Sequence, residues 1–427
     1  MTPSPTVDEV RKAVSIAHDE QWAFVLAATA RVSRDLDLAE DCVQDAYAQA
    51  LTHWPMTGIP ERPGGWLTTV ATRRALEHAR RSATLARKLT LLVPDLEGPA
   101  LDRERVDERF PDDRLRLIFT CCHPALTAEA QVALTLRLVA GLSSAEVARA
   151  FLVREAAMQA RITRAKKKIA QAGIPYRLPT TDDLPERVGA VLDVIHLVYT
   201  SGYTSASGEC LTRDDLSERA VHLARMLDTL LPGRPDVHGL LALMLLTEAR
   251  RPARTGSRGQ LVLLEDQDRN RWDHAMIRDG QRLLRHALTE TPVHRYTVMA
   301  AIAAIHDEAS AWAETDWDQI VGLYDVLAAR WPSPVVALNR CVAHSFTEGP
   351  ERALQRVEML SADPALAAYP YLAATRADLL RRLQRDDEAA DAYDEAAMLT
   401  GNSVEAAYLT GRSRRLRGEH TTPAGGA

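Results

Sequence analysis

Helical periodicity constrains the fold of this chain more than any other feature. Apolar residues recur at three- and four-residue steps in three long stretches between residues 10 and 416. No convincing run alternates between apolar and polar residues, as a half-buried strand would. Ala, Leu and Arg recur throughout the chain, and all three are strong helix formers. The sequence therefore predicts an all-α fold.

Prolines and glycines divide the helical stretches. A chain of 427 residues is long enough for two to four domains, at roughly 100–200 residues each. Within the first stretch, Pro55, Pro60 and Pro63 indicate a loop near residues 54–65. We expect helical domains at 10–85, 112–172 and 186–416, linkers at 86–111 and 173–185, and a disordered tail at 417–427.

Charge is unevenly distributed along the chain. Residues 1–177 hold 25 Lys and Arg against 22 Asp and Glu, a balance of +3, whereas the rest of the chain balances at −9. This difference suggests separate partners for the two halves. The N-terminus lacks the basic start and apolar core of a secretory signal, and no run of about 18 apolar residues is free of charge. These features predict a cytoplasmic protein that does not contact a membrane.

Neither a metal site nor a catalytic site is indicated. The five cysteines are scattered, which argues against a disulfide framework. Cys121 and Cys122 point apart on a helix, and no second pair completes a metal site beside His123. The carboxylates of residues 261–273 alternate with arginines, a pattern more typical of a salt-bridged surface or an interdomain contact. We expect no cofactor and no enzymatic activity.

Residues 35–51 are expected to form a helix with one acidic side. Leu38, Ala39, Cys42, Val43, Ala46, Ala50 and Leu51 recur as one apolar stripe. The opposite side gathers Asp37, Glu40, Asp41, Gln44 and Asp45. An acidic face can steer a basic partner helix, although a solvated surface alone would show the same pattern.

A basic helix is expected at residues 66–81. Trp66, Leu67, Val70, Ala71 and Leu76 predict its buried side. Its basic face consists of Arg73, Arg74, His78, Arg80 and Arg81. Such a face can contact phosphates, and an aromatic residue at its start can pack or stack on an unpaired base.

Residues 142–168 predict two short helices with a compact turn. Ser143 and Glu146 form the S-x-x-E pattern of a capping box. The second helix is expected from near Arg154 to about Ile169, with Met158, Ile162, Ala165 and Ile169 as its buried seam. Residues 154–168 contain six basic residues and one acid. This is the arrangement that reading of the DNA major groove requires, although an αα-hairpin with a basic surface would also fit.

The acidic and basic helices together resemble the second conserved region of the sigma-70 superfamily. The family's polymerase-binding motif stands here as Ala39-Glu40-Asp41-Cys42-Val43-Gln44-Asp45, and Trp66-Leu67 opens the helix that reads and melts the −10 element. The resemblance implies that Glu40, Asp41, Gln44 and Asp45 bind the β′ clamp helices of core RNA polymerase. It assigns −10 DNA binding to Trp66, Arg73, Arg74, His78, Arg80 and Arg81.

The helix pair resembles the fourth conserved region of the same family, which reads the −35 element and contacts the β flap. Its pattern stands here as Leu142-Ser143-Ser144-Ala145-Glu146-Val147-Ala148, although Ala156-Ala157 replaces the usual Gly-Thr. We expect base contacts from Arg154, Glu155 and Gln159. Phosphate contacts are expected from the lysines, Lys167 and Lys168. The resemblance also assigns Arg161 and Arg164 to −35 DNA binding. Only about 30 residues separate the two regions, which is the layout of extracytoplasmic-function sigma factors.

The last part of the chain carries a weak repeat. Arg340 and Arg376 lie 36 residues apart, and residues 351–354 and 387–390 share this offset. A period of about 34 residues is typical of tetratricopeptide repeats. Some sigma factors of the resembled group carry such an extension, which implies regulation in cis through contacts with their own sigma domains. Two alternatives stay open: a one-component DNA-binding regulator with a helical sensor, and a helical scaffold.

Overall fold

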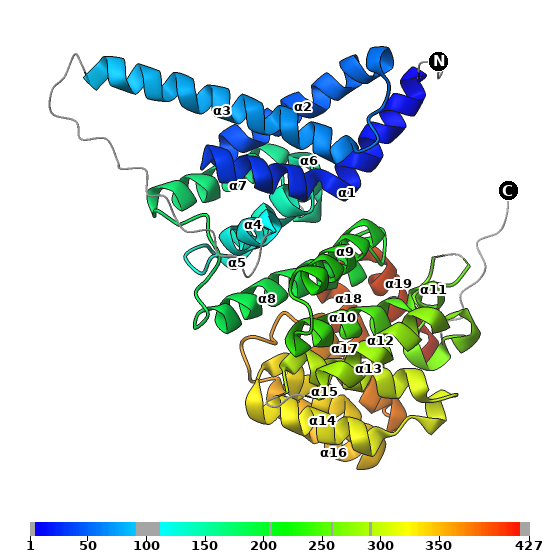
Figure 1. The fold of residues 1–427 in the computed structure, drawn as a ribbon. Helices are drawn as coiled ribbons and strands as arrows, with labels where there is room; N and C mark the ends of the chain where they lie inside the picture. Colours follow the sequence, from blue (N-terminus) through cyan, green and yellow to red (C-terminus); the bar gives the residue numbers. More distant parts are fainter. Residues whose placement is uncertain are drawn as a thin grey trace. The chain divides into compact units, whose positions relative to one another are not determined.

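The computed structural model describes residues 5–90, 112–151, 153–204, 207–257, 259–289 and 293–418. The chain forms two compact units, one ending at Leu197 and the other beginning at Val198. Both units are built from helices (Figure 1), which confirms the predicted all-α class. No helix in these ranges combines the length and the apolar character needed to cross a bilayer.

Three long helices begin the first unit: α1 (Val7–Ser33), α2 (Leu36–Thr57) and α3 (Pro63–Thr90). Thr6 and Glu9 form a capping box at the start of α1. Arg34 adopts a left-handed conformation with φ 54°, which ends α1. The Asp35 side chain then accepts hydrogen bonds from the amides of Asp37 and Leu38, so α2 starts after a turn of two residues.

The predicted loop between the second and third helices is shorter than expected. Helix α2 continues through Pro55 to Thr57, and α3 already begins at Pro63, so the loop spans residues 58–62. Pro63 occupies the first helical position, where its missing N–H would have no intrahelical partner in any case. Helix α3 also extends to Thr90, five residues into the predicted linker. Residues 91–111 of that linker lie outside the described ranges.

The rest of the first unit consists of short helices around a helix-turn-helix. They are α4 (Asp113–Cys121), α5 (Ala128–Leu134), the π-helical turn η1 (Thr135–Val139), α6 (Ser144–Ala150) and α7 (Glu155–Gln171). The expected capping box is present, since Ser143 Oγ accepts from the Glu146 amide and the Glu146 carboxylate accepts from the Ser143 amide. Met158, Ile162, Ala165 and Ile169 are buried, which confirms the predicted seam of α7. Helix α8 (Leu184–Tyr203) contains the division between the units.

The second unit is also helical. Its longer helices are α9 (Asp214–Leu230), α10 (Pro235–Glu248), α12 (His274–Ala287), α13 (Arg295–Glu308), α14 (Trp317–Arg330), α15 (Pro334–Thr347), α16 (Pro350–Leu360), α17 (Pro370–Arg382), α18 (Asp386–Leu399) and α19 (Ser403–Leu416). The single turns are α11 (Arg251–Arg254), η2 (Leu264–Asp266), η3 (Arg269–Arg271) and η4 (Trp312–Glu314). Helices α10, α15, α16 and α17 all begin with proline, so the prolines seen as breaks in the sequence are helix starts.

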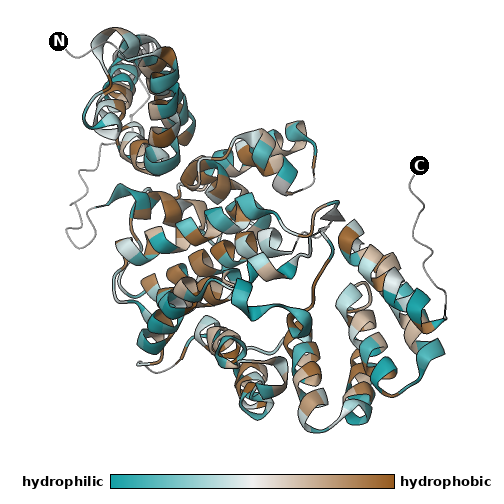
Figure 2. Ribbon diagram, turned by 90° about the vertical axis from the view of Figure 1, so that its right-hand side faces the viewer, coloured by the Kyte–Doolittle hydropathy of each residue, from teal (hydrophilic) through white to brown (hydrophobic). Residues whose placement is uncertain are grey.

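Two kinds of helix build the core of this unit. Many helices carry apolar and polar residues on different faces (Figure 2), as surface helices do. Helix α10 instead is apolar on all sides from Gly239 to Leu246, and it packs against α9, α12 and α13. A helix that is apolar all round must be buried, so α10 is the central element of these four helices.

The predicted repeat corresponds to two successive helical hairpins. Arg340 lies in α15 and Arg376 in α17, the first helices of the pairs α15–α16 and α17–α18. Ala353 and Ala389 occupy equivalent positions in the second helices, and both are fully buried. The 36-residue offset therefore relates equivalent positions of two stacked hairpins.

A small β pairing departs from the helical expectation, as does an isolated antiparallel bridge between Thr255 and Leu261. Strands β1 (Ser207–Gly208) and β2 (Gly401–Asn402) pair in parallel, Ser207 with Gly401 and Gly208 with Asn402. The Asn402 side chain is fully buried and donates to the carbonyl of Cys210, 2.9 Å away. It also accepts from the amides that start α19. Two residues per strand are too few for the alternation that marks a strand in a sequence.

Candidate nucleic-acid and protein interfaces

Helix α2 presents a polar surface formed by the predicted polymerase-binding residues. Ala39, Cys42, Val43 and Ala46 are buried against the neighbouring helices, whereas Leu51 is 45% exposed despite its place in the predicted apolar stripe. Asp41, Gln44 and Asp45 are exposed. Asp45 forms an ion pair with Arg74 of α3, so two predicted site residues are engaged with each other.

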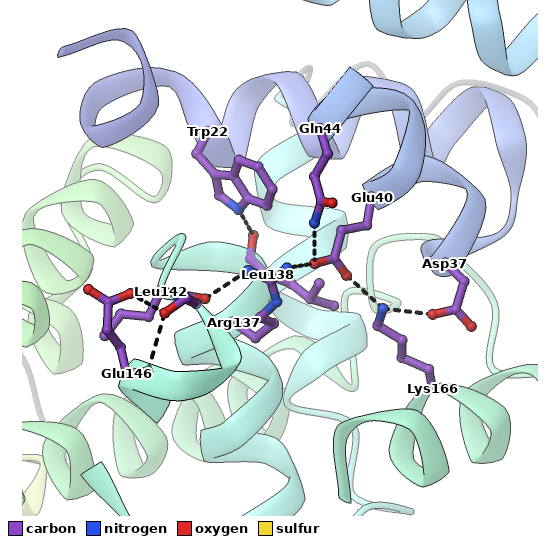
Figure 3. Close-up of polar contacts among 10 residues, drawn as sticks. Trp22, Asp37, Glu40, Gln44, Arg137, Leu138, Leu142, Glu146 and Lys166 are labelled. Carbon is purple, nitrogen blue, oxygen red and sulfur yellow. Dashed lines mark hydrogen bonds and ion pairs between the residues drawn. The ribbon is translucent and has the colours of Figure 1, made fainter. Parts of the chain in front are cut away.

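Glu40 does not lie on the exposed face where the sequence pattern placed it. Glu40 is only 6% exposed. Figure 3 shows its carboxylate facing helices from the other half of the unit. One oxygen forms an ion pair with Arg137 of η1, and the other accepts from Lys166 Nζ of α7 at 2.7 Å. A buried carboxylate is tolerated only when it is paired in this way.

Lys166 and Arg137 were not singled out by the sequence. Lys166 is 9% exposed and also contacts Asp37 Oδ1 at 2.7 Å. Burial opposes its charged form, but Glu40 and Asp37 outweigh that effect and raise the pKa of Lys166 above its ordinary value. Lys166 lies eight residues after Met158, a position that shares the buried side of an amphipathic helix.

Further contacts join α1 and α2 to the short helices from α4 to α7 (Figure 3). The indole N–H of Trp22 in α1 donates to the Leu138 carbonyl at 3.0 Å, and Arg137 lies over the Trp22 ring. Arg31 of α1 pairs with Asp113 of α4 at 2.9 Å. Gly141 has φ +76°, and a Cβ at this position would lie 3.1 Å from the Trp22 ring. The positive φ and this close approach to Trp22 both favour glycine at position 141.

Helix α3 presents the predicted −10 surface. Arg73, His78, Arg80 and Arg81 are exposed, and Arg73 Nε lies 3.2 Å from Glu77. Trp66 is half-buried, with its ring stacked on His53 and edge-on to Trp54. In this structure Trp66 therefore packs within the domain, while the basic side chains face solvent.

The helix-turn-helix presents most of the predicted −35 residues to solvent. Arg154, Glu155, Gln159, Arg164, Lys167 and Lys168 are all exposed. Gln159 donates to Glu155 at 3.0 Å, so these two candidate base-contacting side chains are held together. Arg161 is half-buried and lies over the Phe151 ring at 5.4 Å. It therefore braces the turn between α6 and α7.

The cysteine cluster is buried. Cys121 and Cys122 are free thiols, and Cys122 Sγ lies 3.4 Å from Thr135 Oγ1. Burial raises the pKa of Cys122 to about 11. Among the described residues, no group of three or more Cys, His, Asp or Glu side chains is placed to hold a metal ion. These features are those of cysteines in a packed helical core.

The acidic patch at residues 261–273 has structural partners. Asp268 caps η3, and Asp273 caps α12 by accepting from the Met276 amide. Arg269 donates to the carbonyls of His306 and Ala309. Asp268, Asp273 and Arg269 thus bind backbone groups at helix starts and turns, and within the described residues none of them forms an ion pair with another side chain of the patch, in contrast to the salt-bridged surface that the sequence pattern suggested.

A buried polar group lies beside this patch. The Asp307 side chain is fully buried and pairs with Arg250 at 3.3 Å. Burial raises the pKa of Asp307 to about 7, against the effect of Arg250 and Arg269. Burial also lowers the pKa of His306 to about 3, helped by the same arginines. The His306 ring stacks on Trp312.

Comparison with known proteins supports the motif assignments. Residues 23–84 match the family model described as Sigma-70 region 2, and residues 116–169 match Sigma-70, region 4. Residues 187–288 match a family of unknown function, DUF6596. An uncharacterized protein of Rhizobium meliloti (strain 1021) is 43% identical over 405 residues, which cover 93% of this chain and 95% of that protein.

Proposed function

Because the chain belongs to the sigma-70 superfamily, whose region 2 and region 4 it carries, we propose that it directs core RNA polymerase to a specific set of promoters and starts transcription there. Region 2 and region 4 place the protein in promoter recognition. The proposed partners are the β′ clamp helices and β flap of the polymerase and the −10 and −35 elements of the DNA. We expect it to act in the cytoplasm, where its polymerase partner works.

The order and spacing of the two regions carry this proposal. The region 4 match begins at residue 116, soon after the region 2 match ends at residue 84. A segment of that length is too short for another domain of typical size. The layout supports the extracytoplasmic-function type of sigma factor.

Solvent-exposed charge supports the same roles. Asp41 and Gln44 face solvent on α2, where a basic helix of the polymerase could reach them. Basic side chains face solvent on α3 and α7, where they could neutralise phosphates. A regulator that binds DNA alone would have no use for the acidic surface of α2.

The second unit is proposed to act as a regulator in cis, built on tetratricopeptide-like hairpins. The two stacked hairpins at α15–α18 support this view, since arrays of such hairpins form binding surfaces. Ending the chain after residue 197, where the first unit ends, should change transcript yield from a cognate promoter. Equal yields and equal polymerase affinity for the two chains would argue against a regulatory role.

The decisive experiment is in vitro transcription with bacterial core polymerase on the chain's own upstream DNA and on promoter libraries. We expect promoter-specific transcripts that are lost, by tenfold or more, with Asp41→Ala or Gln44→Ala. Glu129→Ala, an exposed acid on α5, is the matched control and should leave transcription unchanged. DNA binding without core polymerase, together with no initiation in its presence, would favour a one-component regulator instead.

A further inference from the structure

Four polar side chains meet at the C-terminal end of α13 in the second unit. His306 and Asp307 belong to the last turn of that helix. Arg250, which directly precedes α11, lies with its Nε 3.3 Å from Asp307 Oδ1. Arg269, the first residue of η3, donates from Nη1 to the carbonyls of His306 and Ala309 at 2.6 and 2.8 Å. Three separate segments of the chain therefore bring polar groups to one place.

These side chains are buried, yet several of their polar atoms lack a hydrogen bond. The exposed fraction is 0% for the Asp307 side chain and 9% for that of Arg250. Among the described residues, none forms a hydrogen bond with five buried atoms of the group: Asp307 Oδ1 and Oδ2, Arg250 Nε, Arg269 Nη2 and His306 Nδ1. Native proteins leave few buried polar atoms unpaired, and several of them in one place indicate a bound water, ion or ligand.

The charges of this group favour an anion. Arg250 and Arg269 are cationic, and burial holds His306 neutral by lowering its pKa to about 3. Two cations and the ionised carboxylate of Asp307 leave a net charge of +1, which is costly to bury unless an anion offsets it. A metal ion would meet two guanidinium groups, and the described residues hold no cluster of three or more ligating side chains.

The carboxylate of Asp307 restricts which anions fit. An ionised carboxylate only accepts hydrogen bonds, so it repels an oxyanion that carries no hydrogen. Hydrogenphosphate offers what both kinds of side chain require, since its oxygens accept from guanidinium N–H groups and its P–OH donates to a carboxylate. Sulfate has the same tetrahedral shape but carries no hydrogen at neutral pH. A phosphomonoester also loses its last hydrogen near pH 6.

We propose that the C-terminal end of α13 binds hydrogenphosphate, which Arg250 and Arg269 hold by its oxygens and Asp307 recognises by its hydrogen. Arg250 Nε and Arg269 Nη2 are the donors, and Asp307 Oδ2 is the acceptor. His306 Nδ1 is a further donor in the tautomer that protonates it. This site lies within the second unit, so it does not depend on the proposed role in transcription.

Tryptophan fluorescence provides a local measure of binding. The His306 ring stacks on Trp312 with the ring centroids 5.9 Å apart. The Arg269 guanidinium lies over the Trp272 ring at 4.5 Å. An anion that contacts His306 or Arg269 therefore changes the surroundings of an indole ring, and the fluorescence should change with it.

The first experiment titrates the full wild-type chain at pH 8 with inorganic phosphate, methyl phosphate and sulfate, followed by calorimetry and tryptophan fluorescence. At this pH the Asp307 carboxyl, whose pKa is about 7, is ionised. We expect inorganic phosphate to bind, and sulfate and methyl phosphate to bind about tenfold more weakly or less, because each leaves the buried carboxylate without a donor.

A variant at Asp307 tests how the site selects its anion. Asp307→Asn replaces an acceptor with an amide that donates, so the preference for phosphate over sulfate should fall about tenfold, through tighter binding of sulfate. Glu308→Gln makes the same change at the next residue, which is exposed, and should leave both affinities unaltered. Circular dichroism of each variant checks that its helices are intact.

Three results would overturn the proposal. No heat and no fluorescence change with millimolar phosphate would mean that ordered water alone satisfies the buried atoms. Equal binding of phosphate and sulfate by the wild type at pH 8 would show that Asp307 recognises no hydrogen, and a folded Asp307→Asn variant with unchanged preference would show the same. The wild-type titrations decide the matter where the variant does not fold.

Discussion

At the scale of single residues, burial decides which charges are available for binding. Lys166 and Lys167 are neighbours in one basic run, yet Lys166 is buried on Glu40 and Lys167 is exposed. Asp41 and Glu40 differ in the same way, since Asp41 is exposed and Glu40 is buried. The sequence motif identifies all four as polar helix residues, but only the packing of region 4 against region 2 determines which of them meet solvent.

The buried pair His306 and Asp307 predicts opposing effects of pH on stability. Because the pKa of Asp307 is raised to about 7, this side chain stabilises the folded state below about pH 4, and that stabilisation is lost as pH rises towards 7. Because the pKa of His306 is lowered to about 3, this side chain stabilises the folded state above about pH 6.5, and that stabilisation is lost as pH falls. Between pH 4.5 and 6.5 the two slopes oppose each other.

A single substitution at either residue should reveal the pH dependence of stability that the other residue causes. Relative to wild type, the melting temperature of His306→Gln should decline as pH rises from 4.5 to 6.5, and that of Asp307→Asn should increase over the same range. Thermal melts followed by circular dichroism at four pH values would measure this. Three curves that run parallel would show that neither side chain titrates differently in the folded state.

At the scale of elements, local signals place helix starts well and helix ends less well. The capping box at Ser143 and the seam of α7 were predicted from spacing alone, because both depend on residues within a few turns. The extension of α2 through Pro55 was not predicted. It depends on Trp54, whose side chain is fully buried in the core and holds the last turn of the helix. Strands of two residues leave no periodic signal at all.

The capping box gives a prediction for the helix-turn-helix. Ser143→Ala removes the oxygen that accepts from the Glu146 amide and should lower the free energy of unfolding by about 1 kcal/mol. Ser144→Ala is the matched control, because Ser144 is the first helical residue and its side chain makes no cap bond. Urea unfolding would compare the two variants. A larger loss for Ser144→Ala would contradict the assignment of Ser143 as the cap.

At the scale of the whole molecule, the chain closes its second unit with residues far apart in sequence. Gly208 pairs with Asn402, and Asn402 reaches the Cys210 carbonyl, across more than 190 residues. The domain order and the helical class could be read from motifs and composition. This closure and the contact between regions 2 and 4 could not, because both join segments that share no local pattern.

Replacing Asn402 tests the closure of the second unit. Asn402→Ala removes the cap of α19 and leaves the Cys210 carbonyl without its donor, so the free energy of unfolding should fall by about 2–4 kcal/mol. Asn339→Ala, at an exposed position on α15, should have little effect. Denaturant unfolding followed by tryptophan fluorescence would report both. An equal effect of the two variants would mean that the contact between Asn402 and the Cys210 carbonyl does not stabilise the fold.

The late position of Asn402 also orders events during synthesis. A ribosome adds about 5–20 residues per second, so about 10–40 s separate the emergence of Leu197 from that of Asn402. Throughout that interval the first unit has all of its residues, while the second lacks the strand that completes it. Each new molecule therefore passes through a period in which its promoter-reading half is finished and its extension is not.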